Sequence, residues 1–195
     1  TYGALSLSGI RQNRIFFEPL VPGFLHFEVP YCYRCPFNSS YPDCELRSAQ
    51  DLERLIEYEG PKTIAAVIVE PVMSALGSVY PPDFHKYYQK IYKICKENDI
   101  LLIFDEVNNG FGRTGKLFAY EHTSVKPDMF VFGKGITSGY APLGATVVSK
   151  EISEVFKDWM FMHGYTFGGH PASAAAAIAN INIILNEKLY ENAHN

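Results

Sequence analysis

Four short apolar runs constrain the fold of this chain more than any other feature of its sequence. They lie at residues 65–69, 100–104, 129–132 and 145–148, and each is only four or five residues long. Strands that are covered on both faces give such continuous apolar runs, which are typical of parallel sheets. The runs therefore predict an α/β fold with a mainly parallel sheet flanked by helices.

Helical patterns alternate with these runs. Residues 84–95 repeat large apolar side chains at spacings of three and four, which predicts an amphipathic helix. Residues 48–59 show the same spacing, and Gly60 follows them as a stop signal. Ser48 and Asp51 resemble a capping box, so we expect them to begin this helix.

The two ends of the chain differ from its middle. Residues 172–185 are rich in alanine with spaced isoleucines, and they predict a helix packed closely against its neighbours. Residues 1–47 contain five prolines and many aromatic residues, so we expect them to be irregular. No internal repeat or interdomain linker is apparent.

Composition excludes several classes of protein. The 195 residues are 47% hydrophobic and 19% charged, which excludes a disordered chain. The formal net charge is −4, whereas a nucleic-acid binder needs a basic surface. No apolar run approaches the roughly 20 residues of a membrane helix. We therefore expect neither a nucleic acid nor a membrane as a partner.

Three of the four cysteines, Cys32, Cys35 and Cys44, lie close together in the sequence. They could form part of a zinc site, but no fourth ligand lies nearby. A thioredoxin-type pair would open a helix after a strand, whereas Pro36 and the polar residues after it predict a loop. We favour reduced thiols, keep zinc as an alternative, and expect no metal in the functional site.

Polar residues end three of the predicted strands, at Glu70, Asp105 and Lys134. Ligands of parallel sheets bind outside the carboxyl ends of the strands. Lys134 lies between two glycines, where a partly desolvated amine could form a Schiff base with an aldehyde, although a surface lysine explains the segment equally well. Asp105 could pair with a protonated pyridine nitrogen or simply cap the turn that follows.

Two glycine-rich loops have features of phosphate sites. The spacing of Gly110, Gly115 and Lys116 matches the first part of a P-loop, but Leu117 follows where Mg²⁺ coordination needs Ser or Thr. A nucleoside triphosphatase is therefore disfavoured. Thr166 stands among glycines before the alanine-rich helix, where its hydroxyl could bind a phosphate or the loop could simply lead into a helix N-cap.

Taken together, these motifs resemble the signatures of class III aminotransferases, which are pyridoxal-phosphate enzymes of fold type I. Residues 104–115 (FDEVNNGFGRTG) resemble one signature, and residues 126–145 and 166–171 resemble the next two at the family's spacing. Residues 69–72 (VEPV) also fit upstream. The resemblance covers nearly the whole chain and implies part of the large, cofactor-binding domain.

The resemblance implies roles for five residues. Lys134 would hold pyridoxal 5′-phosphate as the internal aldimine and later shuttle a proton, and Asp105 would pair with the pyridine nitrogen. Val107 would pack on one face of the ring, and Asn108 stands where the family often has a longer Gln that contacts the ring oxygen. Thr166 would bind the cofactor phosphate of the neighbouring subunit, so we expect a homodimer with a shared active site.

By the same resemblance, the chain is the central part of a longer enzyme. Family members begin before Thr1 and have a small C-terminal domain that would follow Asn195. Residues 1–195 are thus expected to form a partial large domain that is inactive alone. A targeting segment would precede Thr1, which leaves the compartment, cytoplasmic or mitochondrial, undetermined.

The activity that the resemblance implies is transfer of an amino group from an amine or ω-amino acid to a 2-oxo acid. Residues 31–36 (YCYRCP) resemble ω-amino acid and taurine transaminases that use pyruvate, which favours pyruvate as the acceptor. Aminomutases, racemases and a decarboxylating transaminase share the signatures and remain alternatives. A non-catalytic truncated fragment is a further alternative.

Overall fold

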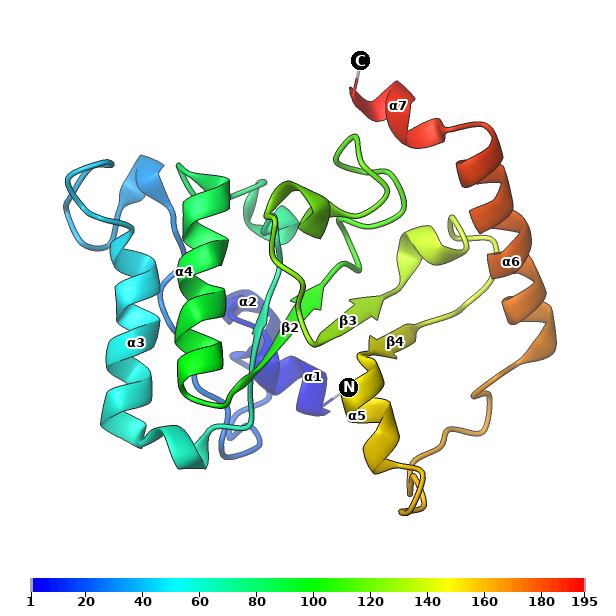
Figure 1. Ribbon diagram of the computed structural model, residues 1–195, viewed down its shortest axis with the longest axis horizontal. Coiled ribbons are helices and arrows are strands. Elements are labelled where there is room, and N and C mark those ends of the chain that lie inside the picture. Colours follow the sequence, from blue (N-terminus) through cyan, green and yellow to red (C-terminus); the bar gives the residue numbers. More distant parts are fainter. Residues whose placement is uncertain (1, 195) are drawn as a thin grey trace.

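A computed structural model of the protein describes residues 2–194 as a four-stranded sheet with helices around it (Figure 1). The strands are β1 (Ala66–Val69), β2 (Leu101–Asp105), β3 (Met129–Phe132) and β4 (Ala145–Val148). The helices are α1 (Tyr2–Leu7), α2 (Arg11–Arg14), α3 (Arg47–Glu59), α4 (Phe84–Glu97), α5 (Lys150–Val155), α6 (Pro171–Asn186) and α7 (Leu189–His194).

The strands are ordered β1-β2-β3-β4 across the sheet. β1 pairs with β2 and β2 with β3 in parallel, whereas β3 and β4 are antiparallel. Val69 lies opposite Phe104, and Asp105 lies opposite Val131, so the carboxyl ends of the first three strands meet at one edge. The predicted α/β class and mainly parallel sheet are confirmed.

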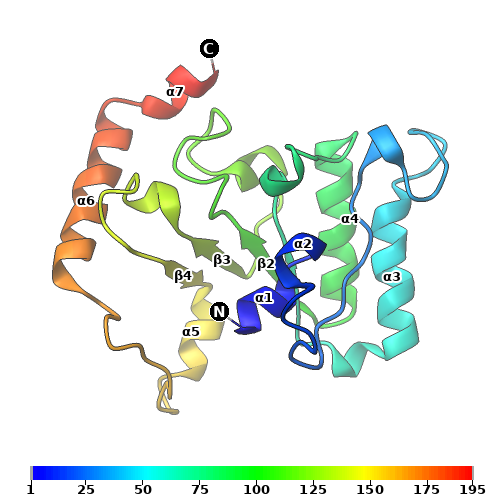
Figure 2. The same cartoon turned by 180° about the vertical axis from the view of Figure 1, so that it is seen from behind.

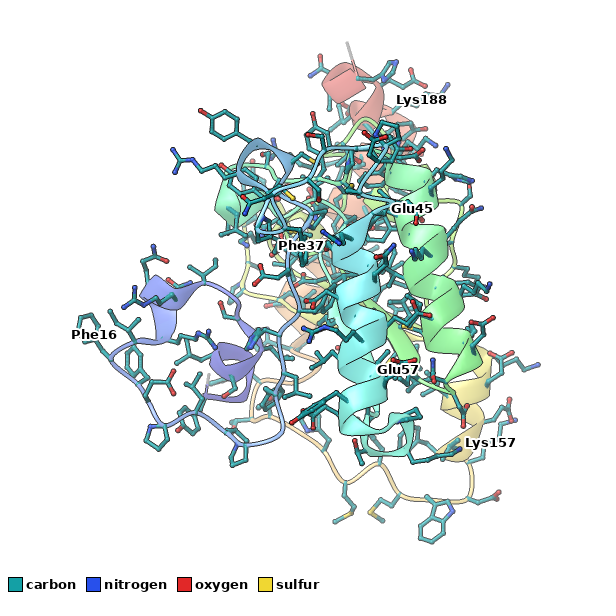
Figure 3. The ribbon with its side chains drawn as sticks, turned by 90° about the vertical axis from the view of Figure 1, so that its left-hand side faces the viewer. Phe16, Phe37, Glu45, Glu57, Lys157 and Lys188 are labelled. Carbon is teal, nitrogen blue, oxygen red and sulfur yellow. The ribbon has the colours of Figure 1, made fainter. Side chains whose placement is uncertain are left out.

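The main hydrophobic core lies between the sheet and the helix pair α3 and α4, which run side by side (Figures 1 and 3). Tyr88 and Ile91 of α4 are fully buried, as are Leu102 and Phe104 of β2. The rings of Tyr88 and Phe104 meet edge to face with centroids 5.4 Å apart. This contact fixes α4 against the strand that ends in Asp105.

The N-terminal segment is largely irregular, as expected, and its helices α1 and α2 are short. In Figure 2 they lie in front of the sheet, on the face turned away from the viewer in Figure 1. Phe16 follows α2 and projects from the molecule with 85% of its surface exposed (Figure 3). Among residues 2–194, no helix is both long and apolar enough to cross a membrane.

The start of α3 differs from the capping box that the sequence predicts. The helix begins at Arg47 after Leu46, so Ser48 lies inside its first turn. The Ser48 hydroxyl instead donates to the carbonyl oxygen of Glu28 and lies 3.0 Å from the Tyr87 hydroxyl. Ser48 is therefore buried against α4 and the N-terminal segment, and its hydroxyl does not cap the helix as the local pattern predicts. Gly60 ends the helix as predicted, with φ 86°.

Helix α6 forms where it was expected, but the prediction that it packs closely against its neighbours was wrong. It stands at the side of the molecule opposite α3 and α4 (Figures 1 and 2). Only Ser173, Ala177 and Ile184 of this helix are buried, and Ile178 is 62% exposed. Its contacts with the sheet domain concentrate on the turn that follows β3.

Candidate active site

Three strand ends gather chemically capable side chains at one edge of the sheet. Glu70 follows β1, Asp105 is the last residue of β2, and Lys134 comes two residues after β3 ends. Because β1, β2 and β3 are parallel neighbours, these positions lie at adjacent carboxyl ends. The sheet thus joins two carboxylates and an amine from segments up to 64 residues apart (Glu70 to Lys134).

Lys134 begins a short 3₁₀ turn, η5 (Lys134–Ile136), and takes a positive φ of 35°. A positive φ is uncommon for a residue with a side chain and is found preferentially at functional sites. The side chain is exposed, and its Nζ donates a hydrogen bond of 2.5 Å to Oδ1 of Asn108. The turn therefore presents the amine to the residues that follow β2.

The glycines on both sides of Lys134 allow the turn to approach the residues after β2. A Cβ at Gly133 would lie 3.3 Å from Cγ1 of Val107. A Cβ at Gly135 would lie 3.1 Å from Cβ of Phe111 and 3.3 Å from the carbonyl oxygen of Gly110. Side chains at either glycine would force these neighbours apart, so the Gly-Lys-Gly sequence is needed for close contact.

Asp105 and Val107 occupy the turn at the end of β2. The Val107 N–H donates to Oδ1 of Asp105 at 2.9 Å, which fixes the carboxylate relative to the chain. Both side chains are half-buried. A carboxylate next to an aliphatic surface suits a flat ring that carries a protonated nitrogen at its edge.

Glu70 is held firmly at the end of β1. The buried Tyr88 hydroxyl donates to the carbonyl oxygens of Glu70 and Pro71 at 2.9 and 2.8 Å, and the Ser74 N–H donates to Oε2 of Glu70 at 3.1 Å. Burial raises the pKa of the Glu70 carboxyl, and the charge of Asp105 raises it further. The Ser74 hydrogen bond, the Lys134 charge and a hydrogen bond with Asn108 oppose this increase in pKa.

Two buried polar residues after β2 support the site and were not singled out from the sequence. Glu106 is fully buried, and its carboxylate accepts the N–H groups of Ala119 and Tyr120 at 3.0 and 2.7 Å. Asn109 is also buried and donates to the Val72 carbonyl oxygen at 3.0 Å. The only signal in the sequence was their position within four residues after the strand-end Asp105.

Thr166 does not join this group of residues in the single chain. It is exposed and lies in the segment between α5 and α6. That segment runs along the side of the molecule opposite α3 and α4 (Figure 1). The structure thus brings together Asp105, Val107, Asn108 and Lys134, and leaves Thr166 apart.

The structure gives no support to the two alternative sites, the zinc site at the cysteines and the P-loop at residues 110–116. Within residues 2–194, no group of three or more His, Cys, Asp or Glu side chains has the arrangement of a metal site, and Cys32, Cys35 and Cys44 are free thiols. The loop from Gly110 to Lys116 leads into a 3₁₀ turn at Ala119–His122. A P-loop instead leads into an α-helix that cradles the phosphates.

The family model for class III aminotransferases matches residues 1–195. The chain belongs to the class III aminotransferases. This family depends on pyridoxal phosphate, and the donor set at the sheet edge fits that cofactor. Lys134 would supply the amine, Asp105 the carboxylate for a ring nitrogen, and Val107 the apolar contact for a ring face.

Curated class III relatives match over nearly the whole chain. A probable aminotransferase of Mycobacterium tuberculosis is 43% identical over 191 residues, covering 97% of this chain and 41% of its own length. Taurine–pyruvate aminotransferase of Bilophila wadsworthia is 41% identical over 200 residues, covering 98% and 43%. The chain thus spans about two fifths of the length of these relatives.

A solved class III structure has the same fold as this chain. The (S)-enantioselective ω-transaminase of Thermomicrobium roseum superposes with a TM-score of 0.92 at 46% identity. The match covers 98% of this chain and 43% of that one. The chain therefore has the fold of a part of that transaminase and spans less than half of its length.

Proposed function

We propose that residues 1–195 are the central part of the large domain of a longer transaminase. That enzyme moves an amino group from an amine or ω-amino acid to a 2-oxo acid, with pyruvate as the acceptor. The observation that carries the proposal is the amine of Lys134, presented at the sheet edge beside Asn108 and Asp105. The pyruvate-dependent taurine and putrescine aminotransferases among the relatives, 41% and 40% identical, support the choice of acceptor.

Each residue at the sheet edge has a role in this proposal. Pyridoxal phosphate supplies an aldehyde that condenses with amines and a ring that withdraws electrons from the substrate carbon. Lys134 would hold the cofactor through Nζ, and the same amine would then hold and move a proton. Asp105 would accept a hydrogen bond from the ring nitrogen and keep that nitrogen protonated, and Val107 would supply an apolar contact to one face of the ring.

Asn108 has a double role in this arrangement. Its Oδ1 accepts from Lys134 Nζ at 2.5 Å, so it orients the amine, and its side chain also stabilises the Glu70 carboxylate. The contact that the family resemblance implies is a different one, between the side chain at position 108 and the ring oxygen of the cofactor, and Asn108 is shorter than the Gln that often makes it. A neutral amide suits this position because it hydrogen-bonds the lysine without adding charge.

We further propose that the enzyme is a homodimer in which Thr166 binds the cofactor phosphate of the partner subunit. The exposed position of Thr166 supports this role, since its hydroxyl is open to a second chain. Large apolar side chains are exposed on both sides of it, namely Trp159, Met160, Phe161, Met162 and Phe167. Such a concentration of exposed apolar side chains is typical of an interaction surface.

Reductive labelling of the full-length protein tests the proposed function. The protein is incubated with pyridoxal phosphate, reduced with borohydride and digested, and the modified peptide is identified by mass spectrometry. We expect one pyridoxyl group, on Lys134, and loss of both the label and transamination in Lys134→Ala. Adducts spread over many lysines, or substantial turnover by Lys134→Ala, would contradict the assignment.

The acceptor requirement separates transamination from the related chemistries. Full-length enzyme is given candidate amines with pyruvate, with 2-oxoglutarate, or with no 2-oxo acid. We expect sustained turnover only with a 2-oxo acid, and faster turnover with pyruvate. Sustained product formation without an acceptor would instead indicate a racemase or aminomutase, and a labelled Lys134 without turnover of any tested amine would indicate a non-catalytic protein.

A further inference from the structure

Both the NH₂ group and the oxygen of the Asn180 side chain, on helix α6, form hydrogen bonds with the turn that carries Lys134. Its Nδ2 donates to the carbonyl oxygens of Gly135 and Ile136 at 2.9 and 3.1 Å. Its Oδ1 accepts the hydroxyl of Ser138 at 2.7 Å. Three hydrogen bonds therefore join one side chain of α6 to three residues of the lysine turn.

The position of Asn180 on the helix is unusual for a polar residue. Ala177, Ile181 and Ile184 follow the spacing of three and four that marks one helix face, and Asn180 lies within that apolar stripe. Ala177 and Ile181 belong to the same hydrophobic cluster as Ile136 of the turn. Since α6 is otherwise largely exposed, its apolar stripe and Asn180 provide its main attachment to this part of the protein.

The turn itself has conformations that need external support. Lys134 and Ser138 both have positive φ, 35° and 49°, which side-chain-bearing residues rarely adopt. Within the turn, the Ile136 N–H donates to Gly133 O at 2.9 Å, but the next two bonds, Thr137 N–H to Lys134 O and Ser138 N–H to Gly135 O, are longer at 3.3 and 3.2 Å. Strained turns of this kind persist only when the surrounding structure holds them.

We propose that Asn180 is a positioning residue, which fixes the turn so that the Lys134 amine faces Asn108. The inference rests on the proposed function, because it concerns the residue that attaches the cofactor. Asn180 acts on the turn through the backbone carbonyl groups of Gly135 and Ile136 and through the hydroxyl of Ser138. It deepens the proposed function by showing that α6, from a distant part of the sequence, controls the geometry of Lys134.

The chain offers a matched pair of substitutions to test this role. Asn180→Asp keeps the shape and the acceptor for Ser138, but it cannot donate to Gly135 and Ile136 and places a negative oxygen against their carbonyl groups. Asn182→Asp makes the same chemical change two residues further along the same helix, at an exposed position. Ser138→Ala, also at an exposed position, removes only the third hydrogen bond.

The experiment measures the Lys134 turn directly in the full-length protein. The first measurement is the rate of reductive pyridoxylation at Lys134, followed by peptide mass spectrometry. The second is amide hydrogen exchange of residues 136–138, and the third is kcat and KM for transamination. For Asn180→Asp we expect about tenfold slower labelling, about tenfold faster exchange, and a lower kcat with little change in KM, since two hydrogen bonds are lost. Ser138→Ala should change the same quantities about two- to threefold, and Asn182→Asp should match the wild type.

The outcomes separate this inference from the proposed function. If Lys134 is not labelled in the wild type, the proposed function fails and the inference fails with it. If Lys134 is labelled in the wild type but at an equal rate in Asn180→Asp, the inference alone is overturned. Faster exchange with unchanged labelling and kcat also overturns it, because Asn180 would then be purely structural. If Asn180→Asp does not fold, the milder Ser138→Ala decides by the same criteria.

Discussion

Removal of the Glu106 carboxylate should loosen the loop that follows β2 and carries Val107 and Asn108. The side chain is fully buried and accepts the N–H groups of Ala119 and Tyr120 at 3.0 and 2.7 Å. Each buried N–H left without a partner costs about 1–3 kcal/mol. Each lost buried methylene adds about 0.8 kcal/mol, and relief of the buried charge offsets part of the total.

Glu106→Ala should therefore lower the free energy of opening this loop by about 3–6 kcal/mol. Glu106→Gln keeps the shape and one acceptor but turns an NH₂ group toward the other N–H. We therefore expect this substitution to lower the opening free energy by only about 1–2 kcal/mol. Native-state amide hydrogen exchange at Ala119 and Tyr120 in the full-length protein reports the opening free energy directly. Glu53→Gln, at an exposed position on α3, is the control and should change nothing measurable.

The effect of Glu106 should also depend on pH. Burial raises the pKa of this carboxyl above its usual value, and hydrogen bonds from Tyr120 and Ala119 only partly oppose it. The folded state thus binds the proton more tightly than the unfolded state. The part of the stability that depends on protonation of Glu106 is fully present below the unfolded pKa and is lost as the pH rises through the folded pKa. The difference in opening free energy between the wild type and Glu106→Gln should therefore become smaller as the pH rises from the unfolded pKa to the folded pKa. Unchanged exchange at Ala119 and Tyr120 in both variants would refute the reasoning.

Two other predictions follow from contacts near the site and from the thiols. Gly135→Ala would bring a Cβ to 3.1 Å from Cβ of Phe111, so we expect weaker cofactor binding by the full-length protein, measured by spectrophotometric titration; unchanged affinity would show that the turn moves freely. Burial raises the pKa of Cys95 to about 12, whereas backbone hydrogen bonds from Ser39 and Phe37 lower that of Cys35. Iodoacetamide at pH 8 should therefore alkylate Cys35 at least about tenfold faster than Cys95 in the native protein, and equal rates by peptide mapping would contradict this.

The elements that the sequence predicted well are those with strong local patterns. Residues 100–104 form β2 with a shift of one residue, and residues 84–95 form most of α4. A strand buried on both faces and a helix with one apolar face leave signatures in the sequence itself. The end of β2 at Asp105 and the turn at Lys134 were predictable for the same reason.

The errors arose where distant residues decide the outcome. Ser48 fits a capping pattern locally, but contacts with Glu28 and Tyr87 determine its place. The alanine-rich composition of α6 suggested close packing, yet most of that helix is exposed in the single chain. Asn180 gave no signal, because an asparagine in a helix is unremarkable until its contacts with the lysine turn are known.

The order of the strands has a consequence for how this protein forms. Within residues 2–194, each strand after β1 pairs with the one that precedes it in the chain, so none of these four strands must insert between two that are already paired. During synthesis the sheet can grow at one edge as the chain emerges, with α4 available before β2 arrives to pack against it. The edge that bears Asp105 and Lys134 is thus assembled by a short stretch of nascent chain, before α6 is made to hold it in place.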